Sequence, residues 1–344
     1  MINILIISFC AILSIIFFIN SKKIANIFNL YDIPNERKIH TKPVPLVGGL
    51  IILFIISIFY ILSNLFSNFE NQNSNIVILS LFIITIFGII DDKLEINPNF
   101  KLLFFIFFFF VYFIINNYLV IYTLKFSSFS YEMNLGYFGI LFTIFCSLLL
   151  INAINMSDGI NGLSALIQII IFSFLIYLNY KNIYLTNSQS VFSDNFFIFA
   201  FFYICILFIF LIFNLYSKVF LGDGGTFLVS FILINSLLLN YKNLEFFYPE
   251  NILMLLWIPG LDMLRVFVLR IRKKRNPFYP DQNHFHHILK KIYNKNFYCL
   301  LYYSALLTVS NITVIKFPQH SLLILILTTL IYFITIFFGK YNKA

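Results

Sequence analysis

Long apolar stretches separated by short polar connections run through the whole chain. About eleven of these stretches approach the roughly 20 residues that a helix needs to cross a bilayer. Between them no polar segment is long enough to build a second core, so the pattern predicts one all-α polytopic membrane domain over residues 1–344. The predicted spans are residues 2–20, 46–66, 76–90, 100–116, 137–154, 162–180, 195–213, 225–240, 251–271, 297–315 and 320–338.

Composition agrees with this pattern and excludes an ordinary soluble domain. Hydrophobic residues make up 60% of the 344 residues, charged residues make up 11%, and the mean hydropathy is +0.91. The net charge of +9 suggests basic loops at a membrane rather than a nucleic-acid partner. The four cysteines lie in or beside apolar stretches without metal-ligand spacing, so neither a disulfide framework nor a zinc site is expected.

The distribution of basic residues predicts the orientation of the chain. Connections after odd-numbered spans, together with the C-terminal tail, hold 19 of the 23 Lys and Arg residues. Basic connections stay in the cytoplasm, which places the N-terminus outside and the C-terminus inside. This topology puts seven of eight aspartates and four of five histidines on the cytoplasmic side. The active site is therefore expected on the cytoplasmic face.

Two adjacent acids, Asp91 and Asp92, directly follow the apolar stretch 76–90. Carboxylates at the C-terminal end of a helix are unfavourable against its dipole, and neighbouring acids repel each other. We therefore expect this pair to hold a positive group, most simply a divalent cation.

The glycine-containing connection before the eighth predicted span suits phosphate groups. Gly222-Asp223-Gly224-Gly225 precedes a predicted helix, whose exposed N–H groups can bind phosphate oxygens, and Asp223 beside them implies an intervening Mg²⁺. Asp223 as a simple helix cap is the alternative.

The first connection carries basic residues that can meet phosphates, with an anchor at lipid headgroups as the alternative. These residues are Arg37, Lys38 and Lys42. Gly48-Gly49 then opens the second span and permits a close approach of backbone or ligand.

Residues 152–162 hold four amide or acid side chains and two glycines. Asp158 or Asn161 could cap the sixth span. The density of polar groups exceeds what a cap requires and favours a cup for a heterocycle and sugar.

The ninth span and the basic loop after it carry further candidates. Pro259 with an Asp262–Arg265 pair is interpreted as a kink with an internal ion pair. Basic residues 270–275 precede three histidines, His284, His286 and His287, which we interpret as phosphate donors rather than zinc ligands. Residues 118–136 are expected to form a short outer hairpin.

These motifs together resemble the polyprenyl-phosphate N-acetylhexosamine-1-phosphate transferases (glycosyltransferase family 4), within residues 32–287. The motifs that carry the resemblance are Arg37-Lys-x-His40 with Pro45-x-x-Gly-Gly49, Asp91-Asp92, Asn152-x-x-Asn-x-x-Asp-Gly-x-x-Gly162, Gly222-Asp223-x-Gly225 and His284-x-His-His287. With Asp281 in front of it, as Asp281-x-x-His-x-His-His, the last motif looks like the branch that uses plain UDP-N-acetylhexosamines.

The resemblance implies transfer of an N-acetylhexosamine-1-phosphate, expected to be GlcNAc-1-phosphate, from a UDP-sugar to undecaprenyl phosphate in the bacterial plasma membrane. UMP is released, and a cell-envelope glycan such as an O-antigen or teichoic acid is started. Mg²⁺ is the implied cofactor, with Mn²⁺ as an alternative, and a homodimer is left open. The implied residues are Asp91 and Asp92 in catalysis, Asp223 at the metal, and Lys42, Asn155, Asp158, Asn161, Phe220, Arg275, His284, His286 and His287 at the substrates.

Other functions remain as alternatives at this point. One is an enzyme similar to the phospho-N-acetylmuramoyl-pentapeptide transferases. A polytopic transporter is another, although transporters place ionisable residues near the bilayer midplane. A structural or pseudoenzyme role in an envelope complex is the last.

Overall fold

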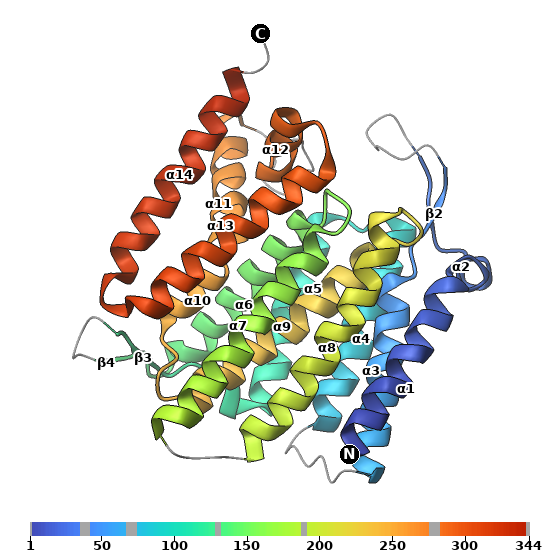
Figure 1. The fold of residues 1–344 in the computed structure, drawn as a ribbon, viewed down its shortest axis with the longest axis horizontal. Helices are drawn as coiled ribbons and strands as arrows, with labels where there is room; N and C mark the ends of the chain where they lie inside the picture. The colour runs from blue at the N-terminus through green and yellow to red at the C-terminus, as the bar shows by residue number, and fades with distance from the viewer. Residues whose placement is uncertain are drawn as a thin grey trace. The chain divides into compact units, whose positions relative to one another are not determined.

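The computed structural model describes residues 2–34, 42–66, 74–127, 132–186, 191–274 and 283–341. Figure 1 shows that helices dominate these residues. Their elements are α1 (Ile2–Ile19), α2 (Ser21–Phe28), β1 (Tyr31–Asp32), β2 (Val44–Pro45), α3 (Gly48–Phe66), α4 (Ser74–Leu94), α5 (Pro98–Ile115), η1 (Asn117–Leu119), β3 (Thr123–Lys125), β4 (Glu132–Asn134), α6 (Phe138–Ser157), α7 (Leu163–Thr186), α8 (Val191–Leu215), α9 (Gly222–Asn243), α10 (Pro249–Leu255), α11 (Trp257–Arg272), α12 (Phe285–Tyr293), α13 (Asn296–Lys316), η2 (Pro318–His320) and α14 (Ser321–Tyr341).

The described helices confirm a polytopic membrane protein. Ten of them are long and apolar enough to cross a bilayer, and α10 with α11 makes up to eleven. Each of the predicted spans corresponds to one of these helices or to the α10–α11 pair. The short helices α2 and α12 were not predicted, because eight or nine residues give too weak a periodic signal. The antiparallel pairing of the predicted hairpin is confirmed in β3 and β4, while its outer location stays a prediction.

The ninth predicted span differs from the expectation of a helix kinked at Pro259. The helix breaks earlier, near Leu256, where α10 and α11 meet at 73°. Pro259 then lies in the first turn of α11, where its missing N–H costs no helical hydrogen bond. The proline therefore lies at the start of the second of two helices that meet at a sharp bend.

The chain divides into two compact units, and the division falls inside α7 and α9. The first unit contains residues 1–96 and 175–233, and within it α1 packs on α3 and α8 while α4 packs on α3 (Figure 1). The second unit contains residues 97–174 and 234–344. Within the second unit α6 packs on α5 and α11, and α12, α13 and α14 pack on one another.

Glycines allow the start of α9 to lie directly against α3 and α4 in the first unit. A Cβ added to Gly88 of α4 would lie 2.4 Å from the Cα of Gly224, and one added to Gly49 of α3 would lie 2.3 Å from the Cα of Gly225. Both contacts are with backbone atoms, which cannot rotate away. Small residues at such contacts are what permits close helix packing in membranes.

Gly88→Ala is expected to destabilise the protein by at least about 2 kcal/mol, since the new methyl group overlaps the backbone of α9. The matched control is Gly260→Ala in α11, where an added Cβ meets nothing within 4 Å. A methyl group there gains helix propensity without a clash. Thermal unfolding of the two purified variants in detergent tests this difference. An unchanged midpoint for Gly88→Ala would show that α4 and α9 are not in backbone contact.

Candidate functional site

Two glycine-containing connections that are far apart in sequence are joined by backbone hydrogen bonds in the first unit. The Phe220 N–H donates to the Pro45 carbonyl at 2.9 Å, and the Gly48 N–H donates to the Phe220 carbonyl at 3.0 Å. The Gly49 N–H donates to the Leu221 carbonyl at 3.2 Å. The predicted close approach at Gly48-Gly49 is therefore confirmed, and its partner is the connection that leads into α9.

Asp92 lies at the N-terminus of α9. Its Oδ1 accepts from the Asp223 N–H at 2.8 Å and its Oδ2 accepts from the Gly224 N–H at 3.2 Å. Gly222 has φ +73°, and a Cβ there would lie 2.7 Å from Asp92 Oδ2. The carboxylate is thus unfavourable at the end of its own helix but favourable at the positive end of another. Sequence reasoning assigned this positive partner to a cation and missed the helix.

Asp91 has a different environment from Asp92 although the two are adjacent. The Asp91 side chain is 2% exposed, and its Oδ1 accepts from the Ile96 N–H at 3.0 Å. Neighbouring residues on a helix point in different directions. Asp91 therefore closes the end of its own helix α4, while Asp92 reaches α9.

The Asp92 carboxylate contacts the backbone of Asp223, so two acidic residues meet at the start of α9. Among the described residues no group of three or more His, Cys, Asp or Glu side chains is arranged to hold a metal ion. Mg²⁺ usually takes one or two protein carboxylates and completes its shell with water and substrate phosphates. A close pair of acids beside helix N–H groups fits a site of that kind.

The other two residues predicted near this end of the first unit lie on its loops. Phe220 is half-buried, and its backbone forms the pairing described above. Lys42 is exposed, two residues before β2.

In the second unit Asn155 lies in the last turn of α6, and the polar loop between α6 and α7 carries Asp158 and Asn161; all three are half-buried. Asp158 is the C-cap of α6, and its N–H donates to the Asn155 carbonyl at 3.2 Å. The alternative in which the side chain of Asp158 or Asn161 caps the following helix stays a prediction. The carbonyl of Gly162, a residue with φ +89°, accepts the first hydrogen bond of α7.

The polar loop and the histidine motif are brought together by Gly159 and His286. A Cβ at Gly159 would lie 2.1 Å from His286 Nε2, so a larger residue there would displace the His286 ring. His286 is 3% exposed, and none of the described residues provides a hydrogen-bond partner for its Nε2. This buried nitrogen beside the polar loop is suited to a ligand.

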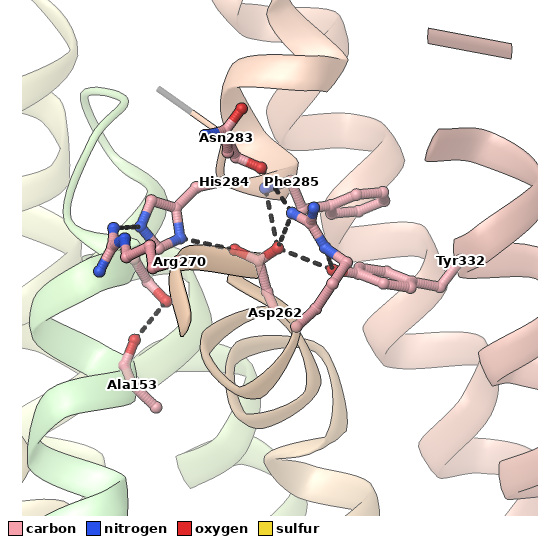
Figure 2. Close-up of polar contacts among 9 residues, drawn as sticks. Ala153, Asp262, Arg270, Asn283, His284, Phe285 and Tyr332 are labelled. Atoms are coloured by element: carbon pink, nitrogen blue, oxygen red, sulfur yellow. Dashed lines mark hydrogen bonds and ion pairs between the residues drawn. The ribbon is translucent and has the colours of Figure 1, made fainter. Parts of the chain in front are cut away.

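His284 differs from the other two histidines, and Figure 2 shows its own contacts. Its Nδ1 lies 2.9 Å from Asp262 Oδ2, and its Nε2 lies 3.3 Å from the Arg270 guanidinium. Arginine only donates, so Nε2 accepts and the ring proton sits on Nδ1. Both ring nitrogens are therefore engaged within the protein, and the prediction that His284 donates to a substrate phosphate does not fit this arrangement.

Burial keeps the remaining two histidines of α12 neutral. It lowers the pKa of His286 well below its ordinary value of 6.5, and the nearby His287 and His284 rings add to this effect. Burial, His284 and the Lys290 and Lys291 ammonium groups lower the pKa of His287 to about 4. Each ring can still donate one N–H to a ligand without carrying charge.

Some predicted residues lie outside the described residues, and the sequence did not reveal all contacts of others. Arg275 lies outside them, as do Arg37, Lys38, His40 and Asp281. The Asp262–Arg265 ion pair is confirmed at 2.7 Å, yet its links to the histidine motif were missed. An acid within an apolar span was the available signal for them.

The model of glycosyl transferase family 4 matches residues 74–240, which include Asp91, Asp92, Asp223 and the polar loop. Over these residues the chain is similar to glycosyl transferase family 4. The resemblance drawn from the motifs is thereby confirmed.

The similarity to known proteins extends over most of the chain. An undecaprenyl-phosphate alpha-N-acetylglucosaminyl 1-phosphate transferase of Yersinia pestis is 27% identical over 284 residues, which is 81% of this chain and 74% of that protein. The proteins of the same name from Escherichia coli (strain K12) and Salmonella typhi are each 28% identical, over 80% of this chain and 73% of theirs.

The two neutral histidines make stability depend on pH. Between the ordinary histidine pKa of about 6.5 and about 4, the unfolded chain takes up protons that the folded chain does not. The free energy of unfolding is therefore expected to fall as the pH decreases through this range. Thermal unfolding at about pH 7 and about pH 5 measures the effect. His287→Gln should reduce the difference between the two midpoints, and an equal difference in this variant would contradict the assignment.

Proposed function

We propose that this protein transfers an N-acetylhexosamine-1-phosphate, most simply GlcNAc-1-phosphate, from a UDP-sugar to undecaprenyl phosphate. The observation that carries the proposal is the hydrogen bond from the Asp223 N–H to the Asp92 carboxylate at the N-terminus of α9, which joins two predicted site acids in a chain similar to this family. The names of relatives that match about 80% of the chain support the acceptor and the sugar.

The reaction is one phosphoryl transfer. An oxygen of the lipid phosphate forms a bond to the sugar-bearing phosphorus of the UDP-sugar, and the bond from that phosphorus to UMP breaks. The products are a lipid-linked diphosphate sugar and UMP. Such a reaction needs positioning and neutralised charge more than it needs covalent chemistry from the protein.

In the first unit the acids would serve the diphosphate. Mg²⁺, or Mn²⁺ in its place, would be held by Asp223 with help from Asp91 or Asp92, and when bound it supplies charge neutralisation. The Asp92 carboxylate accepts from the N–H groups of Asp223 and Gly224. These two hydrogen bonds hold the backbone of Asp223 in place without a substrate. The other acid of the Asp91–Asp92 pair would orient or deprotonate the lipid phosphate. Phe220 and Lys42 would contact the nucleotide.

In the second unit the polar loop and α12 would serve the sugar nucleotide. Asn155, Asp158 and Asn161 offer hydrogen-bond groups for a base and a sugar. His286 and His287 would donate N–H groups from neutral rings. Arg275 would donate from its charged guanidinium.

The surroundings of the reaction follow from the same proposal. The protein would lie in the bacterial plasma membrane with its N-terminus outside, its C-terminus in the cytoplasm and both substrate-binding regions facing the cytoplasm. Its product would start an envelope glycan such as an O-antigen or teichoic acid.

The donor is tested by supplying membranes that contain the protein with undecaprenyl phosphate and one UDP-sugar at a time. The donors are UDP-N-acetylglucosamine, UDP-N-acetylgalactosamine and UDP-N-acetylmuramoyl-pentapeptide. UMP and a lipid diphosphate of the matching mass are expected with a plain N-acetylhexosamine. Product from the pentapeptide donor alone would favour the peptidoglycan-type enzyme, and no lipid product from any donor would reject transfer.

Asp223→Asn is expected to lower Mg²⁺-dependent UMP release by at least about 100-fold, because the amide cannot replace a carboxylate at a cation. Asp194→Asn is the matched control, since Asp194 lies exposed in the first turn of α8. Its activity should equal that of the parent protein. Full activity of Asp223→Asn across a Mg²⁺ titration would remove the metal assignment.

A further inference from the structure

Asp262 of α11 is the centre of a buried polar cluster in the second unit (Figure 2). Asp262 is buried, with 7% of the residue exposed. Oδ1 accepts from the Arg265 guanidinium at 2.7 Å, from the Tyr332 hydroxyl at 2.7 Å and from the Phe285 N–H at 3.0 Å. Oδ2 meets His284 Nδ1 at 2.9 Å.

Tyr332 and Arg265 fix the direction of this carboxylate. The Tyr332 hydroxyl donates to Asp262 Oδ1 and accepts from Arg265 Nε at 2.7 Å. The guanidinium also donates to the Asn283 carbonyl at 2.5 Å, which ties down the residue before His284. Tyr332 is fully buried in α14, the last helix of the chain. Arg265 and Tyr332 therefore hold the carboxylate in the orientation in which it contacts α12.

The contact with Phe285 gives Asp262 control over the start of α12. The N–H groups of the first turn of a helix have no partners within the helix, and a negative charge beside them is favourable. Phe285 is the first residue of α12, and His284 is its N-cap. Asp262 holds both, so the position of His286 against Gly159 depends on it.

We infer that Asp262 and Tyr332 are positioning residues for the histidine motif. Tyr332 orients the Asp262 carboxylate, Asp262 fixes the start of α12, and α12 places His286 and His287 beside the polar loop. The last helix is thereby part of the functional machinery, although it lies beyond the residues that the family model matches. The kinetic consequence rests on the proposed function, while the effect on α12 does not.

Tyr332→Phe tests the inference, and Tyr302→Phe is the matched control. Tyr302 of α13 makes an equivalent hydroxyl contact to Thr335 of α14, at 2.7 Å, without touching Asp262. Hydrogen–deuterium exchange of the peptide covering residues 284–293 is measured for the purified proteins. Faster exchange is expected in Tyr332→Phe and unchanged exchange in Tyr302→Phe. Equal exchange in both variants would overturn the inference.

Kinetics with UDP-N-acetylglucosamine and undecaprenyl phosphate provide the second readout. Tyr332→Phe is expected to lower kcat/KM for the UDP-sugar about 10-fold, and Asp262→Asn about 100-fold, with KM for the lipid phosphate unchanged. Because Tyr332 acts through Asp262, the double variant should lose no more than Asp262→Asn alone. Losses that multiply would show independent roles and overturn the inference.

The two proposals fail in different ways. If the parent protein releases no UMP with any donor, the proposed function fails, and the exchange data alone decide whether Tyr332 controls α12. If the parent protein is active and Tyr332→Phe behaves like Tyr302→Phe in both readouts, the positioning role fails while the proposed function stands.

Discussion

A carboxylate in apolar surroundings is stable only where hydrogen-bond donors or cations meet its charge. In each unit of this protein, one carboxylate accepts hydrogen bonding from backbone N–H at a helix N-terminus. Asp92 accepts two N–H groups from the first turn of α9, and Asp262 accepts the first N–H of α12. In both cases the acid comes from a different helix. The helix that receives the charge is thereby fixed in place, together with the functional residues of its first turn.

The first of these contacts requires close packing that only glycine permits. Gly88 and Gly49 lie against the glycines of α9, and Gly222 leaves room for the Asp92 carboxylate. Backbone hydrogen bonds between Phe220 and residues 45 and 48 hold the preceding connection. The glycines that suggest a phosphate loop in the sequence therefore have a structural task as well. They let an acid reach the helix end at which the proposed substrate phosphates would bind.

The histidine motif shows how a shared residue type can conceal different tasks. His284 uses both ring nitrogens inside the protein, whereas His286 keeps a buried Nε2 without a partner among the described residues. Burial holds the pKa of His286 and His287 below the ordinary value, so these rings donate as neutral groups. Charge for the substrate phosphates must then come from arginine, lysine or a bound cation.

The sequence by itself determined the membrane class, the helical spans and the residues of the polar motifs, because hydropathy and local residue type decide these features. It could not show that the chain bends by 73° between α10 and α11, since Pro259 indicates a disturbance without locating it. It also could not show that Asp92 meets α9 across 131 positions or that Tyr332 meets Asp262 across 70. Contacts of this kind leave no periodic signal in the chain. Only the packing of distant helices brings a carboxylate to an open helix end, and that tertiary contact decides what each acid does.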